Sequence, residues 1–203
     1  NLKCIGILIL SDVIRQDAKT TLDYFKRQDV DIKIISGDDP VTVSAIARRC
    51  HLLNYEHYID VSSLSDEQIK EAIEKYTIFG RVSPKQKQLM VNALQENNHT
   101  VAMTGDGVND VLALKAADCS IAMASGSDAA KNASHIVLLK NNFNAMPHIV
   151  NEGRRVINNI TASASMYLIK TIFSVVLSIG MILFGHGYPF KPIQLTVISA
   201  CCV

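Results

Sequence analysis

Apolar runs alternate with charged amphipathic stretches through most of the chain. The amphipathic stretches predict helices, with Ser65 as a cap and Pro84 in a first turn, at Asp17–Gln28, Pro40 to about His51, Ser65–Lys75, Pro84–Asn97 and Val108–Ala117. The apolar runs predict strands at Leu2–Leu10, Asp31–Ile35, Tyr76–Phe79, Thr100–Met103, Cys119–Met123 and Ile136–Leu139. Because strands alternate with helices, we predict an α/β fold with a parallel sheet flanked by helices on both faces.

The pattern changes near residue 159. From Ile160 to Phe184 the only formal charge is Lys170. A helix of these residues would be about 37 Å long, enough to cross a hydrocarbon core of about 30 Å with some tilt. The alternative is a buried helix of a soluble protein, which rarely needs so long an uncharged run. We therefore predict one long helix over Phe143–Phe184 that enters a membrane, followed by the start of a returning span at Pro192–Val203.

Composition narrows the class of protein. The 203 residues carry a formal net charge of +1 and contain no Trp. No basic run is present, so nucleic-acid binding has no electrostatic support. Five cysteines at no metal-ligand spacing indicate reduced thiols rather than a disulfide framework. The chain opens on an apolar strand without an initiating Met and stops within an apolar segment, so we interpret it as part of a longer protein.

The octet Met103–Asp110 carries the strongest chemical signal. It places two carboxylates, Asp106 and Asp110, four residues apart between a predicted strand and a predicted helix. Gly105 and Gly107 permit close approach of a ligand to the backbone. Since carboxylate oxygens suit Mg²⁺ and open α/β sheets bind ligands at the carboxyl ends of their strands, we predict a Mg²⁺ and phosphoryl site. The alternative is a turn followed by a capped helix.

Two further segments suggest anion binding. Ser36-Gly37-Asp38 follows a strand and opens a helix, so its N–H groups and the Ser36 hydroxyl could cradle phosphate oxygens. A capped turn is the alternative. Lys85 lies in the first turn of a predicted helix, where a positive charge opposes the helix dipole unless an anion faces it.

The octet, together with Ala116–Met123 (A-A-D-C-S-I-A-M) and Ser127–Lys131 (S-D-A-A-K), resembles the hinge signature of P-type cation-transporting ATPases, members of the haloacid dehalogenase-like superfamily. The resemblance covers nearly the whole chain. It implies a haloacid dehalogenase-like parallel sheet, Mg²⁺ as cofactor, ATP as substrate, and phosphoryl transfer to an aspartate whose acyl phosphate is later hydrolysed. The family's acceptor loop D-K-T-G-T and nucleotide-binding insertion are not in this sequence. We therefore expect the second half of a phosphorylation domain, inactive alone.

The resemblance also assigns roles. Ser36, Gly37 and Asp38 match the family's T-G-D. The pattern R-x-x-P-x-x-K assigns the phosphoryl-binding lysine to Lys87, with Lys85 as the alternative and Arg81 as a secondary nucleotide contact. Asp12 and Arg15 match D-P-x-R, with Val13 in place of proline, and imply a contact on the nucleotide side. Asp106 and Asp110 would be the carboxylates that bind the metal. Asn109 and Thr104 would hydrogen-bond a phosphoryl oxygen or a metal-bound water.

The resemblance implies four segments: residues 1–142, the second half of the phosphorylation domain; 143–185, a stalk and the fifth transmembrane helix; 186–192, an extracytoplasmic loop; and 193–203, the start of the next transmembrane helix. It implies an integral protein of the cell membrane with residues 1–159 cytoplasmic. Basic residues of the stalk, Arg154 and Arg155, agree with positive charge on the inside.

Candidates for the transport path are Lys170, Thr171, Ser174 and Ser199. Lys170 would face the bundle interior, or else extend to the membrane surface. Pro192–Leu195 resembles the P-x-Q-L of calcium and sodium pumps, but Ser199 and Val203 stand where those pumps have an asparagine and an aspartate. This departure disfavours calcium and leaves the cation open. Cys201 and Cys202 are alternative soft-metal ligands, although the cysteine–proline–cysteine motif of heavy-metal pumps is not present.

Two other classes fit part of the pattern. A membrane-tethered or soluble phosphatase of the same superfamily would share Ser36, the lysine and Asp106. A catalytically inactive regulatory relic is the third possibility, and the intact Asp106, Asn109 and Asp110 argue against it.

Overall fold

The computed structural model describes residues 16–140, 142–185, 194 and 197. The chain divides into two compact units, Asn1–Pro147 and His148–Val203. The predicted strand Leu2–Leu10 lies outside the described residues. Of the predicted returning span Pro192–Val203, only Gln194 and Val197 are described, so that expectation stays a prediction.

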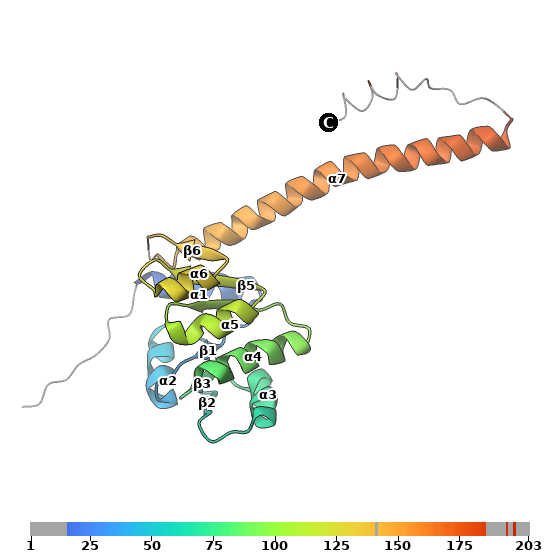
Figure 1. The fold of residues 1–203 in the computed structure, drawn as a ribbon. Helices are drawn as coiled ribbons and strands as arrows, with labels where there is room; N and C mark the ends of the chain where they lie inside the picture. Colours follow the sequence, from blue (N-terminus) through green and yellow to red (C-terminus); the bar gives the residue numbers. More distant parts are fainter. Residues whose placement is uncertain (1–15, 141, 186–193, 195–196, 198–203) are drawn as a thin grey trace, which may run out of the picture. The chain divides into compact units, whose positions relative to one another are not determined.

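Helices and strands alternate through the first unit, as predicted (Figure 1). The helices are α1 (Gln16–Arg27), α2 (Pro40–Arg49), α3 (Asp66–Lys75), α4 (Pro84–Glu96), the 3₁₀ turn η1 (Val108–Asp110), α5 (Val111–Ala116) and α6 (Asp128–Ala133). The strands are β1 (Ile34–Ile35), β2 (Tyr58–Asp60), β3 (Ile78–Gly80), β4 (Ala102–Gly105), β5 (Cys119–Met123) and β6 (Ile136–Leu138).

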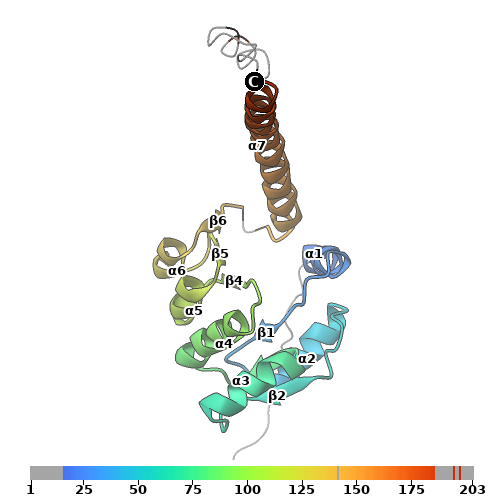
Figure 2. The ribbon, with the colours of Figure 1, turned by 90° about the vertical axis from the view of Figure 1, so that its right-hand side faces the viewer.

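The strands form two three-stranded parallel sheets, with orders β1-β3-β2 and β4-β5-β6. Helix α2 packs on the first sheet, α5 and α6 pack on the second, and α4 lies between α3 and α5 (Figure 2). The largest buried side chains gather where α3 and α4 cover β3; they include Phe79, Ile69, Ile73 and Met90. The predicted parallel α/β architecture with flanking helices is confirmed.

Local sequence chemistry explains where the helices around β3 begin. Ser65 accepts a hydrogen bond from the Gln68 N–H, and the Gln68 side chain accepts one from the Ser65 N–H, which closes a capping box before α3. Ser83 and Gln86 form the same box before α4. Each box satisfies backbone donors that a helix start leaves unpaired, so the first turn of each helix is fixed.

The structure differs from the sequence prediction in several elements. Strand β2 and helix α6 were not predicted, because both are too short for a clear periodic signal. The helix expected over Val108–Ala117 is a 3₁₀ turn followed by α5. Strand β4 is partly exposed, with the side chains of Ala102 and Thr104 accessible. Among the described residues β4 pairs only with β5, so its other edge is open.

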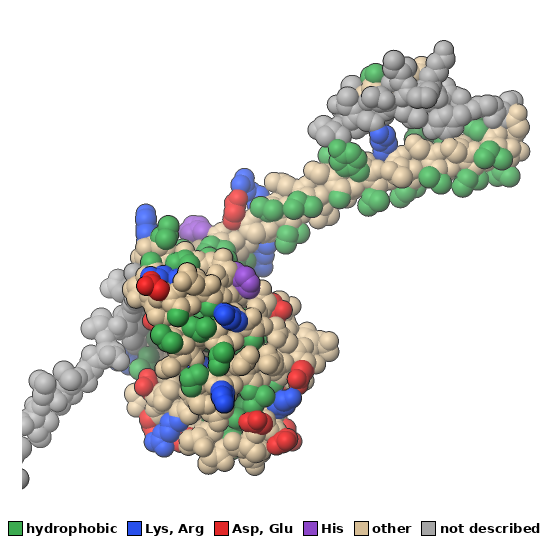
Figure 3. All heavy atoms as spheres, in the orientation of Figure 1, with side chains coloured by type: hydrophobic (Ala, Val, Ile, Leu, Met, Phe, Trp, Pro, Cys, Tyr) green, Lys and Arg blue, Asp and Glu red, His purple; other side chains and the backbone are tan. Residues whose placement is uncertain are grey.

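The second unit contains most of α7 (Ala145–Leu183), a single helix of 39 residues. By length and composition it could cross a membrane, and it is the one such helix among the described residues. Apolar side chains lie exposed along it (Figure 3), including Ile172, Val176 and Ile179. Exposure of so many large apolar groups is unfavourable in water and expected in lipid.

Candidate active site

Backbone hydrogen bonds join the loops that follow β1 and β3. The Arg81 N–H donates to the Asp38 carbonyl (2.8 Å), and the Val82 N–H donates to the Ser36 carbonyl (3.0 Å). Gly80 allows this contact, since a Cβ there would lie 2.5 Å from Pro40 at the start of α2. The two segments therefore form one edge at the carboxyl ends of the strands.

Ser36-Gly37-Asp38 forms a tight polar loop. The Asp38 N–H donates to the Ser36 hydroxyl oxygen (3.1 Å), and that hydroxyl donates to the Asp38 carboxylate (3.2 Å). Gly37 is exposed, and a Cβ there would meet nothing within 4 Å. Packing within the described residues thus does not require glycine at position 37, and the open space can receive a ligand atom.

Arg81, the secondary nucleotide candidate, is held by two carboxylates. Its guanidinium lies 2.8 Å from an Asp39 oxygen and 3.1 Å from an Asp60 oxygen. Hydrogen bonds from the Ser62 hydroxyl and N–H, followed by the charge of Arg81, hold the pKa of Asp60 below its usual range. These contacts position Arg81 beside the Ser36 loop, with 53% of its side chain exposed.

Lys87 and Asp110 form a largely buried ion pair. Lys87 Nζ lies 2.7 Å from Asp110 Oδ1, and each side chain is 11% exposed. Asp110 Oδ2 accepts a hydrogen bond from the Gly107 N–H (3.2 Å). Lys85, the alternative in the sequence, is exposed. The structure therefore places Lys87, and not Lys85, against the octet.

Asp106 and Asp110 differ in surroundings despite their spacing. Asp106 lies between β4 and the 3₁₀ turn, so the two residues are not related by a regular helical turn. The Asp106 side chain is exposed, and no described residue forms a hydrogen bond or ion pair with it. Asn109 and Thr104 are exposed as well. The octet thus combines one available carboxylate with one that is neutralised by Lys87.

Two residues that the sequence analysis left without a role contact the Asp106 backbone. The Ser127 N–H donates to the Asp106 carbonyl oxygen (2.8 Å). A Cβ at Gly126 would lie 2.8 Å from the same oxygen and 3.1 Å from the Asp106 Cα. The S-D-A-A-K match included Ser127, but its contact with Asp106 joins residues 21 positions apart and has no local sequence signal.

The donors fit Mg²⁺ bound together with a phosphorylated substrate. No group of three or more His, Cys, Asp or Glu side chains among the described residues could enclose a metal ion. Mg²⁺ does not need such an enclosure, because it is commonly held by one or two carboxylates together with water and substrate phosphate oxygens. Asp106 offers a suitable exposed carboxylate.

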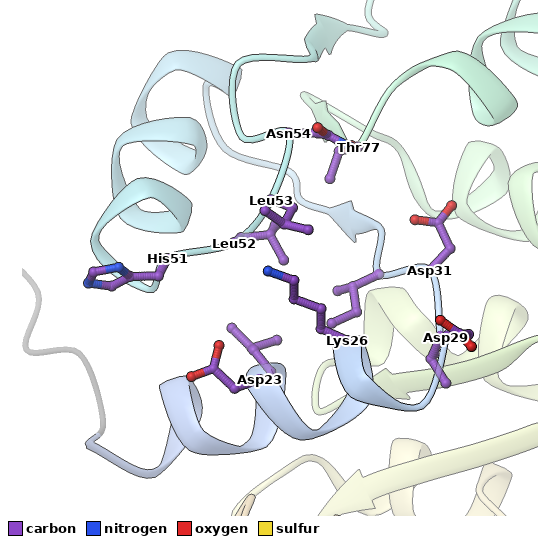
Figure 4. Close-up of a pocket in the computed structure, with 12 residues that line it drawn as sticks. Asp23, Lys26, Asp29, Asp31, His51, Leu52, Leu53, Asn54 and Thr77 are labelled. Carbon is purple, nitrogen blue, oxygen red and sulfur yellow. The ribbon is translucent and has the colours of Figure 1, made fainter.

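A cavity of about 310 Å³ lies elsewhere in the first unit (Figure 4). Asp23 and Lys26 of α1 line it, as do His51 and Leu53 from the segment after α2. None of the predicted site residues that the structure describes lines it. This cavity and the described candidate catalytic groups are therefore separate.

Several predicted residues lie outside the described part of the chain: Asp12, Arg15, Ser199, Cys201 and Cys202. On α7, the Thr171 hydroxyl donates to the Tyr167 carbonyl (3.0 Å), and the Ser174 carbonyl accepts a hydrogen bond from Ser178 (2.8 Å). Such bonds satisfy hydroxyl donors inside an apolar helix. Lys170 is half-buried one position before Thr171.

A family model described as haloacid dehalogenase-like hydrolase matches residues 2–118. The chain belongs to this family. The match includes the Ser36 loop, Lys87 and the octet.

Curated relatives confirm the resemblance to P-type cation-transporting ATPases. The chain is 48% identical over 207 residues to a probable cation-transporting ATPase, exp7, of Streptococcus pneumoniae. It is 46% identical over 210 residues to the calcium-transporting ATPase CtpE of Mycobacterium bovis. These alignments cover 98% and 96% of this chain but 27% and 26% of the relatives. The chain thus spans about a quarter of their length.

Solved structures of related proteins agree. A zinc-transporting PIB-type ATPase in an E2.Pi state matches 87% of this chain and 24% of its own, with a TM-score of 0.67 and 25% identity. The catalytic domain of the CPx-ATPase CopB-B matches 69% of this chain and 46% of its own, with a TM-score of 0.54 and 28% identity. Both matches support the family fold.

Proposed function

We propose that this chain is part of a P-type ATPase that couples ATP hydrolysis, through an aspartyl phosphate, to cation transport across a membrane. The observation that carries the proposal is the Lys87–Asp110 ion pair beside the exposed carboxylate of Asp106. This pair fixes the Lys87 ammonium group at the loop where the family resemblance assigns phosphoryl transfer. The relatives of 46–48% identity named as cation-transporting ATPases support the same function.

In this proposal the described residues neutralise and orient a phosphoryl group. Lys87 contributes positive charge, and Ser36 turns its hydroxyl from Asp38 toward a phosphoryl oxygen. Asn109 donates a hydrogen bond to another oxygen or to water. Asp106, with Asp110 in support, would hold Mg²⁺, which would supply charge neutralisation at the transferred group. Arg81 contacts the nucleotide side, together with Asp12 and Arg15, which belong to the part of the chain not described.

The membrane part of the proposal rests on α7. We propose that residues 143–185 form the stalk and a transmembrane helix, with residues 1–159 on the cytoplasmic side of the cell membrane. Lys170, Thr171 and Ser174 would face the transport path, joined by Ser199. The ion itself is to be found by experiment, beginning with Ca²⁺ because the mycobacterial relatives are named calcium-transporting.

The test is phosphorylation of the full-length protein in membrane vesicles by radiolabelled ATP and Mg²⁺. We expect an acid-stable, hydroxylamine-sensitive label that Asp106→Asn abolishes. Asn132→Ala, an exposed change on α6, is the matched control and should keep the label. A panel of cations, Ca²⁺ among them, then identifies the ion that changes the label. An undiminished label in Asp106→Asn would refute the role of Asp106.

A phosphatase of the same superfamily is the second candidate, favoured by one observation: the matching family model is described as a hydrolase and ends at residue 118, before α7. Such an enzyme would release phosphate from small phosphate esters without a transported cation. If no cation changes either the phosphorylated intermediate or ATP hydrolysis, the phosphatase is the better interpretation.

A further inference from the structure

The segment Gly126–Ser127 contacts the backbone of the predicted metal ligand. It lies between β5 and α6, and the Gly126 N–H donates to the Met123 carbonyl (3.0 Å), which closes a turn. The next N–H, of Ser127, donates to the Asp106 carbonyl at 2.8 Å. The turn therefore holds the peptide of Asp106 from outside the octet.

The space between this turn and Asp106 excludes even a methyl group. An added Cβ at Gly126 would lie 2.8 Å from the Asp106 oxygen, 3.0 Å from the Met123 oxygen and 3.1 Å from the Asp106 Cα. All three are backbone atoms, so no flexible side chain can yield. A residue larger than glycine at 126 must displace the backbone that carries the Asp106 carboxylate.

The residue after Asp106, Gly107, is held by a hydrogen bond as well. The Gly107 N–H donates to Asp110 Oδ2, and Asp110 is in turn fixed by Lys87. On the other side, the Ser127 hydroxyl caps α6 by accepting from the Ala130 N–H (3.1 Å), which anchors the turn to a helix. Asp106 and Gly107 thus lie between two anchored partners, while the Asp106 side chain stays exposed.

We infer that Gly126 and Ser127 are positioning residues for Asp106: their turn sets where its carboxylate meets Mg²⁺ and the phosphoryl group. This inference rests on the proposed function. Groups that orient a metal ligand typically change metal affinity about 10–100-fold when altered. A metal site also requires its ligand to be held within about 0.5 Å.

Ser127→Pro and Ser127→Ala separate the contact from the cap. Ser127 has φ −62°, which proline adopts, but the proline ring removes the N–H to Asp106 and puts its Cδ in the place of the amide hydrogen, so the Asp106 carbonyl 2.8 Å away must move. Both variants lose the hydroxyl cap, but alanine keeps the N–H. In the full-length protein we expect Ser127→Pro to raise the Mg²⁺ concentration for half-maximal phosphorylation at least about 10-fold over Ser127→Ala. The maximal label at saturating Mg²⁺ should be retained.

Hydrogen exchange without Mg²⁺ or ATP provides a readout independent of activity. Ser127→Pro should speed exchange in the 104–110 segment relative to Ser127→Ala, while the α3 segment stays unchanged. Gly126→Ala should also speed exchange in this segment, because its Cβ displaces the Asp106 backbone. This variant provides the test if Ser127→Pro does not fold. Equal Mg²⁺ dependence and equal exchange in Ser127→Pro and Ser127→Ala would overturn the inference. Because exchange needs no phosphorylation, an unlabelled wild type would refute the proposed function separately.

Discussion

Lys87 Nζ lies 2.7 Å from Asp110 Oδ1, and only 11% of each side chain is exposed. The pair joins the first turn of α4, which follows β3, to the turn that follows β4. The ion pair therefore links the helix that follows a strand of the first sheet to the turn that follows a strand of the second sheet. Its burial makes it sensitive to the loss of either partner, because a remaining charge would be uncompensated.

Removal of one partner should destabilise the first unit. We expect Lys87→Met or Asp110→Asn each to lower the free energy of unfolding by roughly 2–4 kcal/mol, somewhat less than for a fully buried pair because water still reaches both groups. The double variant should recover about 1–3 kcal/mol of the summed loss. Denaturant unfolding of the wild type, the two single variants and the double variant in detergent measures these free energies. Strict additivity of the two single changes would contradict the coupling.

Gly105 should not tolerate a side chain. A Cβ there would lie 2.6 Å from the Asp110 Cβ, which the 3₁₀ turn and Lys87 hold in place. We expect Gly105→Ala to cost about 1–3 kcal/mol of stability through displacement of Asp110. Gly37→Ala is the matched control, since an added Cβ there meets nothing within 4 Å; its stability should change by less than about 1 kcal/mol. Thermal unfolding of both variants decides the point, and equal losses would argue against a steric cause.

Asp118 should make stability depend on pH in the acid range. Hydrogen bonds from the Val101 N–H and then the Gln95 side chain lower the pKa of its carboxyl. A lowered folded-state pKa means that the stabilisation is fully present above the ordinary value of about 3.9 and disappears as pH falls through the folded-state value. Wild type should therefore exceed Asp118→Asn in stability at pH 6, and the difference should begin to shrink below about pH 3.9 and vanish once the pH lies below the lowered folded-state pKa. A difference that grows toward acid pH would reverse the assigned sign.

Helix α7 should insert into a bilayer, and an added charge should oppose insertion. Val175 is exposed in the apolar part of the helix. We expect Val175→Asp to make insertion of the 143–185 segment less favourable by about 2.5–3.5 kcal/mol, while Val175→Leu leaves insertion unchanged or improves it. Glycosylation mapping in a host membrane protein reports the inserted fraction. Poor insertion of the unchanged segment would count against a transmembrane role.

The fold class and most element positions of the first unit could be predicted from sequence, because they follow from local periodicity and end signals. Ser65 and Pro84 marked helix starts correctly, and Cys119–Met123 is the predicted strand. Short elements such as β2 and α6 were not predicted, because they contain too few residues to show a hydrophobic period. The pairing of β4 with β5 alone among the described strands could not be predicted either, since pairing joins segments that are far apart in the sequence.

The sequence by itself determined the α/β alternation, the apolar helix and the loops that carry Ser36 and Asp106. These properties depend on residues close together in the chain. Tertiary structure alone decided that Lys87 pairs with Asp110 while Lys85 faces solvent, and that Gly126 and Ser127 hold the Asp106 backbone. The physical reason is that burial, ion pairing and steric exclusion arise between segments that only folding brings together.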